Sequence, residues 1–178
     1  QLGVLVSPAA TTEESYLAAR IARGLGSENV DHRLRRQDFR DASGDPVAPT
    51  LGCGIAELEK ASAVLLVGSD VRKEVPIIAH RIRQGTVRHG SKVASISTRA
   101  VNVLFPLVAN LASNGYGMAQ HVAAVLAVAL RSAGQAAPAS VAGALEGIAP
   151  TAEHERIAAM LAQGELRVIL LGALAERH

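Results

Sequence analysis

One turn in this 178-residue chain has residue types and a position that could support chemistry. Gly68-Ser69-Asp70 follows the apolar run of residues 63–67 and precedes a helical pattern. Open α/β sheets bind ligands at such places, because backbone amides and a helix amino terminus converge there. A tight connection from strand to helix also needs a glycine, and Asp70 could cap the helix or repel a phosphate. We therefore favour an empty, structural turn, with nucleotide binding as the alternative.

Four basic side chains surround this turn and the helix after it: Arg72, Lys73, Arg81 and Arg83. They could form a cradle for an anion. They could equally form a solvated face with Glu74 as a partner, or contact a neighbouring subunit, since arginine is enriched at interfaces. We favour the solvated face or the interface, because the lysine spacing of a phosphate-binding loop is missing.

The most polar cluster is Asp31-His32-Arg33 with Arg35, Arg36 and Asp38. A catalytic histidine needs an orienting partner and a substrate pocket, so we favour a hydrogen-bonded loop that links two lobes. The histidines His80, His121 and His154 show no metal-ligand spacing and are interpreted as packed or surface residues. The sequence therefore predicts neither a catalytic residue nor a metal ligand.

Cys53 is the single cysteine and lies between two glycines. One thiol rules out an internal disulfide framework, and it cannot hold an iron–sulfur cluster, which needs four protein ligands. No neighbouring motif would lower its pKa, so we expect neither a redox nor a ligand role.

Composition excludes several classes of partner. Basic residues outnumber acidic ones by 18 to 16, and this net charge of +2 without clustering predicts no nucleic-acid binding. No apolar run is long enough for a membrane span, and no signal peptide is recognisable, so we expect no direct membrane insertion. The chain lacks an initiator Met and begins in a strand-like run. We therefore expect it to be a piece of a longer polypeptide.

The elements that must position these residues alternate between strands and helices. Continuous apolar runs predict strands at residues 2–6, 63–67, 92–97 and 166–171. Capping residues and spacing predict helices starting near Thr11 and Thr151 and at residues 55–61, 74–86 and 117–131. Residues 101–112 are apolar but ambiguous. Continuous apolar strands favour a mainly parallel sheet covered on both faces by helices, a three-layer α/β/α arrangement.

We expect one α/β region over residues 1–178. Within it the pattern allows sub-lobes at residues 1–54 and 55–134, a linker rich in Ala, Gly and Pro at 135–150, and a final helix and strand at 151–178.

Three stretches carry a family resemblance. The first runs from Gly3-Val4-Leu5-Val6-Ser7-Pro8 through Glu13-Glu14-Ser15-Tyr16 to Gly26-Ser27-Glu28-Asn29-Val30-Asp31-His32-Arg33. The second is Val67-Gly68-Ser69-Asp70 with Glu74, Pro76 and Arg81-Ile82-Arg83, and the third is Leu170-Leu171-Gly172-Ala173-Leu174-Ala175-Glu176-Arg177-His178. In order and spacing they resemble molybdopterin oxidoreductases and a relative of that family, the large iron–sulfur subunit of bacterial NADH–quinone oxidoreductase (complex I).

The resemblance implies a Rossmann-like unit similar to the central domains of formate dehydrogenase and DMSO reductase. It implies a parent subunit that carries electrons from NADH toward quinone, with iron–sulfur clusters in an amino-terminal part absent here. The expected partners are the rest of that subunit and other peripheral-arm subunits, on the cytoplasmic side of the bacterial inner membrane.

The resemblance also bears on a cofactor. In cofactor-bearing relatives, the turn at Gly68, Ser69 and Asp70 and the segment after the next strand contact a molybdopterin guanine dinucleotide. That second segment usually reads Asp-Pro-Arg, whereas here it reads Ser97-Thr98-Arg99. We therefore expect no bound cofactor in this region, with Gly68, Ser69, Asp70 and Arg99 as vestigial positions. The alternative is a dinucleotide-binding domain of a formate dehydrogenase-like or nitrate reductase-like enzyme.

Overall fold

The computed structural model describes residues 2–7, 10–32 and 51–176. Arg33, Arg35, Arg36 and Asp38, for which a hydrogen-bonded loop was predicted, lie outside these ranges. The chain divides into two compact units, Gln1–Ser43 and Gly44–His178. Each unit is described by itself. The division into sub-lobes near residue 54 stays a prediction.

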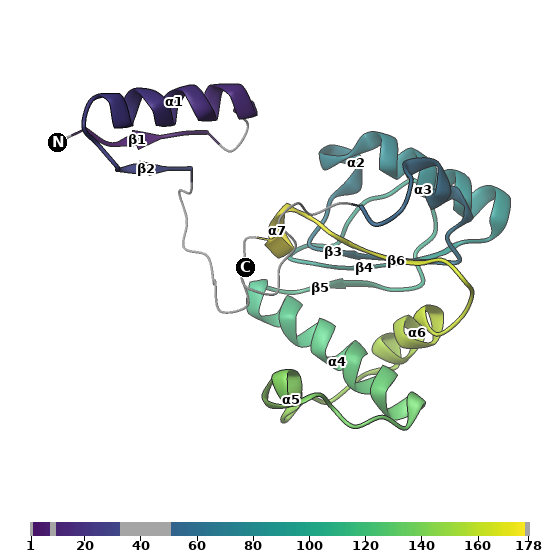
Figure 1. Cartoon of the computed structure of the whole chain (residues 1–178). Coiled ribbons are helices and arrows are strands. Elements are labelled where there is room, and N and C mark those ends of the chain that lie inside the picture. Colours follow the sequence, from purple (N-terminus) through teal and green to yellow (C-terminus); the bar gives the residue numbers. More distant parts are fainter. Residues whose placement is uncertain (1, 8–9, 33–50, 177–178) are drawn as a thin grey trace. The chain divides into compact units, whose positions relative to one another are not determined.

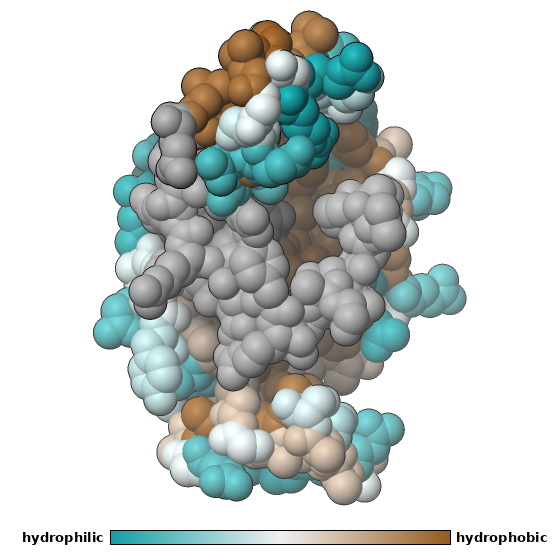
Figure 2. All heavy atoms as spheres, turned by 60° about the vertical axis from the view of Figure 1, so that its left-hand side comes forward, coloured by the Kyte–Doolittle hydropathy of each residue, from teal (hydrophilic) through white to brown (hydrophobic). Residues whose placement is uncertain are grey.

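Within its described residues, 2–7 and 10–32, the amino-terminal unit contains one helix and a pair of short parallel strands (Figure 1). Strand β1 (Val4–Leu5) pairs with β2 (Val30–Asp31), and helix α1 (Thr12–Gly24) connects them. The predicted helix start is confirmed, because Thr11 and Glu14 form a capping box. Leu17, Ile21 and Leu25 recur at helical spacing as expected but are largely exposed, and brown apolar side chains gather on this unit at the top of Figure 2.

The larger unit is built on a four-stranded parallel sheet in the order β5-β4-β3-β6. Its strands are β3 (Ala63–Val67), β4 (Lys92–Ser97), β5 (Asn110–Ala112) and β6 (Arg167–Leu171). β3 is fully buried and pairs with β4 on one side and β6 on the other. The apolar runs predicted at residues 63–67 and 92–97 are therefore the two central strands, whereas the run at 166–171 forms the edge strand β6, in which Ile169 and Leu171 are exposed.

Helices cover both faces of this sheet (Figure 1). The 3-10 helix η1 (Ile55–Lys60) and helices α2 (Val71–Glu74) and α3 (Pro76–His89) lie on one face, over a core that includes Val64, Leu66 and Ile82. Helices α4 (Gly115–Ala133) and α6 (Ala152–Leu161) lie on the other, over Leu65, Val67 and Ile96. The expected three-layer α/β/α fold with a parallel sheet is confirmed.

Several elements differ from the expected pattern. The helix expected at residues 74–86 is α3, which begins at Pro76, and a separate short helix, α2, precedes it; Pro76 disfavours a helical conformation at Val75, which separates the two. The ambiguous stretch 101–112 ends in β5, and the expected linker at 135–150 contains helix α5 (Ala139–Leu145). A further short helix, α7 (Ala173–Glu176), follows β6.

Candidate functional site

The carboxyl ends of three parallel strands meet at the predicted turn. Gly68-Ser69-Asp70 follows β3, Arg99 lies shortly after β4, and Gly172 follows β6. The ends coincide because residue 67 at the end of β3 is in register with Ile96 of β4 and Leu171 of β6. This is the edge at which open α/β sheets bind ligands.

The space beside Gly68 is filled by the chain itself. Gly68 has a φ of +61°, and a Cβ added there would lie 2.5 Å from the backbone nitrogen of Ala175. The Leu174 N–H donates to the Gly68 carbonyl at 3.2 Å, and the Gly172 N–H donates to the Val67 carbonyl at 2.9 Å. The glycine thus permits the close approach of α7, which takes the place that a ligand would need to reach this backbone.

Glu74 accepts hydrogen bonds from the donors around the turn. The hydroxyl of Ser69, which is buried, donates to Glu74 Oε2 at 3.1 Å, and the Asp70 N–H donates to Oε1 at 3.1 Å. The Ala173 N–H approaches Oε2 at 3.5 Å. These are the kinds of donor that bind a phosphate in a strand-to-helix turn. Here a carboxylate of the protein occupies them.

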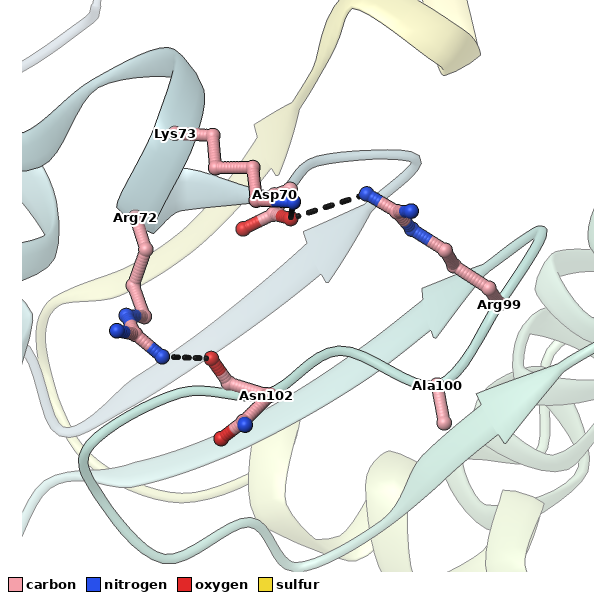
Figure 3. A pocket seen from close by; sticks show the side chains of 6 residues that line it. All are labelled: Asp70, Arg72, Lys73, Arg99, Ala100 and Asn102. Carbon is pink, nitrogen blue, oxygen red and sulfur yellow. Dashed lines mark hydrogen bonds and ion pairs between the residues drawn. The ribbon is translucent and has the colours of Figure 1, made fainter.

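Next to the turn lies an open hollow of about 360 Å3, lined by Asp70, Arg72, Lys73, Arg99, Ala100 and Asn102. Figure 3 shows the Asp70 carboxylate between two cations, with Arg99 Nη2 at 3.3 Å and Lys73 Nζ at 3.8 Å from its Oδ2. The Arg72 guanidinium donates to the Asn102 carbonyl at 2.9 Å. An incoming anion would therefore meet Lys73 and Arg99 already paired with the Asp70 carboxylate, and the carboxylate itself in the lining of the hollow.

The loop that forms one wall of this hollow is fixed by Asn110. Its side-chain amide donates to the Val101 carbonyl at 3.0 Å, and its Oδ1 accepts from the Val101 N–H at 3.2 Å. These two hydrogen bonds fix the position of Val101 and of the segment after β4. Arg99 and Asn102 therefore belong to an ordered wall of the hollow.

The remaining basic candidates separate into different environments. Arg81 on α3 forms an ion pair with Glu59 of η1 at 2.5 Å, and this contact lowers the pKa of the Glu59 carboxyl. Arg83 and His80 are exposed on α3, and both lie near Arg72, with which they line another hollow. The structure therefore does not gather the four predicted cations into one cradle.

Two histidines that sequence reasoning treated separately form a pair. His121 Nδ1 on α4 lies 2.9 Å from His154 Nε2 on α6, and His154 is only 4% exposed. The Thr151 N–H donates to His154 Nδ1 at 2.8 Å, so the hydrogen bonds assign the proton to Nε2, which donates to His121. Burial lowers the pKa of His154, with His121 as a second cause. No sequence signal links these residues, because the contact joins helices far apart in the chain.

Other predicted residues take structural positions. Cys53 is half-buried and packs against the core that includes Val64, Leu66 and Ile82. His32 is exposed beside Asp31. Within residues 2–7, 10–32 and 51–176, no three His, Cys, Asp or Glu side chains are grouped to hold a metal ion. No helix in the same ranges is long and apolar enough to cross a membrane.

The fold and the strand-end turn correspond to a known family. The model of the molybdopterin oxidoreductase family matches residues 1–133, and the chain belongs to this family. It is 33% identical to the G subunit of NADH-quinone oxidoreductase from Streptomyces coelicolor over 120 residues, which is 57% of this chain and 14% of that protein. The corresponding protein of Mycobacterium tuberculosis is 33% identical over 113 residues, covering 61% of this chain and 14% of the relative.

A second group of relatives carries different names. The chain is 34% identical over 98 residues to a putative formate dehydrogenase of Staphylococcus aureus, covering 52% of this chain and 10% of that protein. The chain thus spans about one seventh or less of the length of these relatives.

Proposed function

We propose that this region is a structural and assembly part of an electron-transfer protein similar to the G subunit of NADH–quinone oxidoreductase, in which the molybdopterin site has been lost. The parent would carry electrons from NADH toward quinone. Its iron–sulfur clusters would lie in another part of the polypeptide, because the single Cys53 cannot supply four ligands.

The observation that carries this proposal is the filled turn after β3. Glu74 occupies the Ser69 and Asp70 donors, and the backbone of α7 lies against Gly68. A pyrophosphate brought to this turn would face the carboxylates of Asp70 and Glu74, and would need the backbone of α7 to move. The residues present therefore do not fit a molybdopterin guanine dinucleotide at this position, and Ser97 stands where the cofactor-bearing pattern has an aspartate.

The setting follows from the same proposal. The partners would be the rest of the same polypeptide and other components of the peripheral arm. The assembly would sit on the cytoplasmic side of the bacterial inner membrane. The similarity to the two G subunits supports this assignment.

The alternative is a dinucleotide-binding domain of a formate dehydrogenase-like enzyme. The similarity to putative formate dehydrogenases favours it, as does a hollow of about 360 Å3 with Arg72, Lys73 and Arg99 at its wall. In that case Arg99 would have to release Asp70 to reach the ligand.

A cofactor inventory of the purified protein tests the proposal. Molybdenum and tungsten are measured by elemental analysis, and pterin by its fluorescence after acid oxidation. We expect both below stoichiometric amounts. Stoichiometric pterin would refute the loss of the site and establish the alternative.

A further inference from the structure

A second hollow lies beside the one in Figure 3, with Arg72 in the lining of both, between α3 and the loop that contains Leu104 and Phe105. Its volume is about 220 Å3. Small-molecule sites are usually about 300–1,000 Å3, so this hollow suits one side chain of a partner better than a free ligand. Its lining residues are Arg72, Pro76, His80, Arg83, Leu104 and Phe105, with Ala79 at the base.

The floor and the rim of this hollow differ in chemistry. Phe105 and Ala79 are buried and form an apolar floor, while Leu104 is 65% exposed at the edge. Arg72, His80 and Arg83 supply the polar rim, and all three are exposed. An apolar centre inside a polar rim that contains arginine is typical of a protein-binding surface.

The guanidinium groups of Arg72 and Arg83 keep N–H donors that a partner could bind. The Arg72 guanidinium uses one N–H on the Asn102 carbonyl, which orients the group and leaves further donors. The Arg83 guanidinium has no hydrogen-bond or ion-pair partner within the part of the chain that the structure describes. The nearest acidic residues in sequence do not neutralise them, because Asp70 pairs with Arg99 and Lys73, and Glu74 binds the turn.

Charge is concentrated on this segment. Residues 70–90 contain five Arg or Lys and two acidic residues, a net charge of +3, although the whole chain carries only +2. The rim cations are also separated, since Arg83 lies seven residues after the start of α3 and therefore about 10 Å along its axis. Carboxylates on both sides of one apolar side chain would match this arrangement.

We propose that this hollow, defined by Arg72, Pro76, His80, Arg83, Leu104 and Phe105, is a docking site for an acidic segment of a partner protein that inserts one apolar side chain between carboxylates. Single-stranded nucleic acid is a poorer fit, since it needs exposed aromatic rings for stacking and Phe105 is only 9% exposed. The site adds a partner-facing surface to the proposed assembly role and depends on that role only for its biological setting.

The test uses the isotopically labelled chain and a synthetic peptide with one leucine flanked on both sides by glutamates, followed by NMR. We expect amide shifts confined to the first turns of α3 and the loop around Leu104, and binding that weakens as salt increases. Two control peptides replace the leucine by serine or the glutamates by glutamine, and both should bind more weakly.

Matched variants locate the contact. Arg83→Gln should raise the dissociation constant of the peptide about fivefold, which is the effect of losing one partly exposed charge contact. Arg156→Gln, an exposed arginine on α6 at the opposite face of the sheet, should leave it unchanged. Leu104→Ser should weaken binding without changing the salt dependence. Circular dichroism confirms that each variant is folded.

Three results would overturn the docking site: no peptide binding, equal losses in R83Q and R156Q, or shifts elsewhere on the protein. Binding to vesicles of anionic lipid in place of the peptide would also overturn it in favour of a membrane surface. These outcomes are independent of the cofactor inventory. Stoichiometric pterin would refute the assembly role and leave the peptide result standing.

Discussion

At the scale of single residues, the Glu74 carboxylate connects the turn after β3 with the chain after β6. It is exposed on α2, yet its two oxygens accept hydrogen bonds from the turn after β3 and approach the Ala173 N–H after β6. One side chain thereby connects two strand ends that are distant in sequence. Its removal leaves the buried Ser69 hydroxyl without its acceptor.

The first prediction concerns this side chain. Glu74→Ala should lower the free energy of unfolding by about 1 kcal/mol, the usual net value of a partly exposed hydrogen-bonded group. That corresponds to a fall in Tm of about 2–4 °C for a chain of this size, measured by thermal circular dichroism. Glu155→Ala removes only an exposed pair with Arg131 and should cost less than about 0.5 kcal/mol. Equal losses would show that Glu74 does not support the turn.

The second prediction concerns two glycines of nearly equal conformation. Gly68 and Gly134 have φ of +61° and +63°, but only Gly68 has another backbone within contact distance. Gly134→Ala should therefore lower the free energy of unfolding by about 1–2 kcal/mol, because alanine is strained in the left-handed conformation. Gly68→Ala should cost about 1–3 kcal/mol more, because Ala175 must move. Chemical denaturation measures both, and equal values would mean that α7 does not press on the turn.

The sequence predicted the position of the turn and favoured an empty, structural turn, which stays a prediction, but it did not predict the contacts around it. A buried apolar strand followed by Gly-Ser-Asp was enough to place it at the sheet edge. The roles of Glu74 and Asn110 could not be predicted, since each bonds to a backbone whose position depends on the folded chain. The pairing of His121 with His154 was missed for the same reason.

At the scale of elements, the His121–His154 contact links α4 to α6 on one face of the sheet. Only the neutral form of His154 can accept the Thr151 N–H at Nδ1 while donating from Nε2. Protonation at Nδ1 would therefore place an N–H of His154 against the Thr151 N–H and break the cap of α6. Acid should weaken the packing of these two helices.

The third prediction is the pH dependence of stability. The pKa of His154 is lowered in the folded protein, chiefly by burial, whereas the unfolded chain has the ordinary value of about 6.5. The unfolded state thus binds the proton first. The contribution of neutral His154 is complete above about pH 6.5 and is lost as the pH falls below it toward the lowered folded pKa.

Urea unfolding at a series of pH values between about 7 and 5 measures this loss. This range lies above the ordinary pKa values of carboxyl groups, so their titration contributes little to the slope. His154→Gln should flatten the dependence, because glutamine cannot titrate. His80→Gln removes an exposed histidine on α3 and should keep the native slope. A native slope in H154Q would assign the acid sensitivity to another group.

The long elements of the larger unit were predictable, and several short ones were not. The buried strands β3 and β4 and the helices α3 and α4 have patterns that span their full length. By contrast β2 has two residues and β5 three, and their strand character comes from the neighbours with which they pair. α5 and α7 are equally short, and their sequences carry too little periodicity to distinguish them from loops.

At the scale of the whole molecule, both apolar cores belong to the larger unit. All their buried residues lie between Leu58 and Val168, whereas Ala22 is the buried apolar residue of the amino-terminal unit within the described ranges. The larger unit therefore has its own source of stability.

The fourth prediction follows from this distribution. A truncated protein of residues 44–178 should unfold cooperatively with a single transition, measured by circular dichroism and by tyrosine and amide NMR spectra. A peptide of residues 1–43 should lack a stable helix by itself, because so short a chain buries little surface. Loss of cooperativity in 44–178 would show that the amino-terminal residues are needed for the core.

The sheet order has a consequence for the time at which the turn closes. β3 pairs with β4, which follows within thirty residues, but its other neighbour β6 is made about one hundred residues later. On the ribosome, therefore, β3 and β4 can associate while the sequence for β6 and α7 is not yet synthesised. During that interval Gly68 has no backbone against it. The segment that closes the turn is made after β3 and β4, so the newly made chain passes through a stage in which this sheet edge is open to the solution.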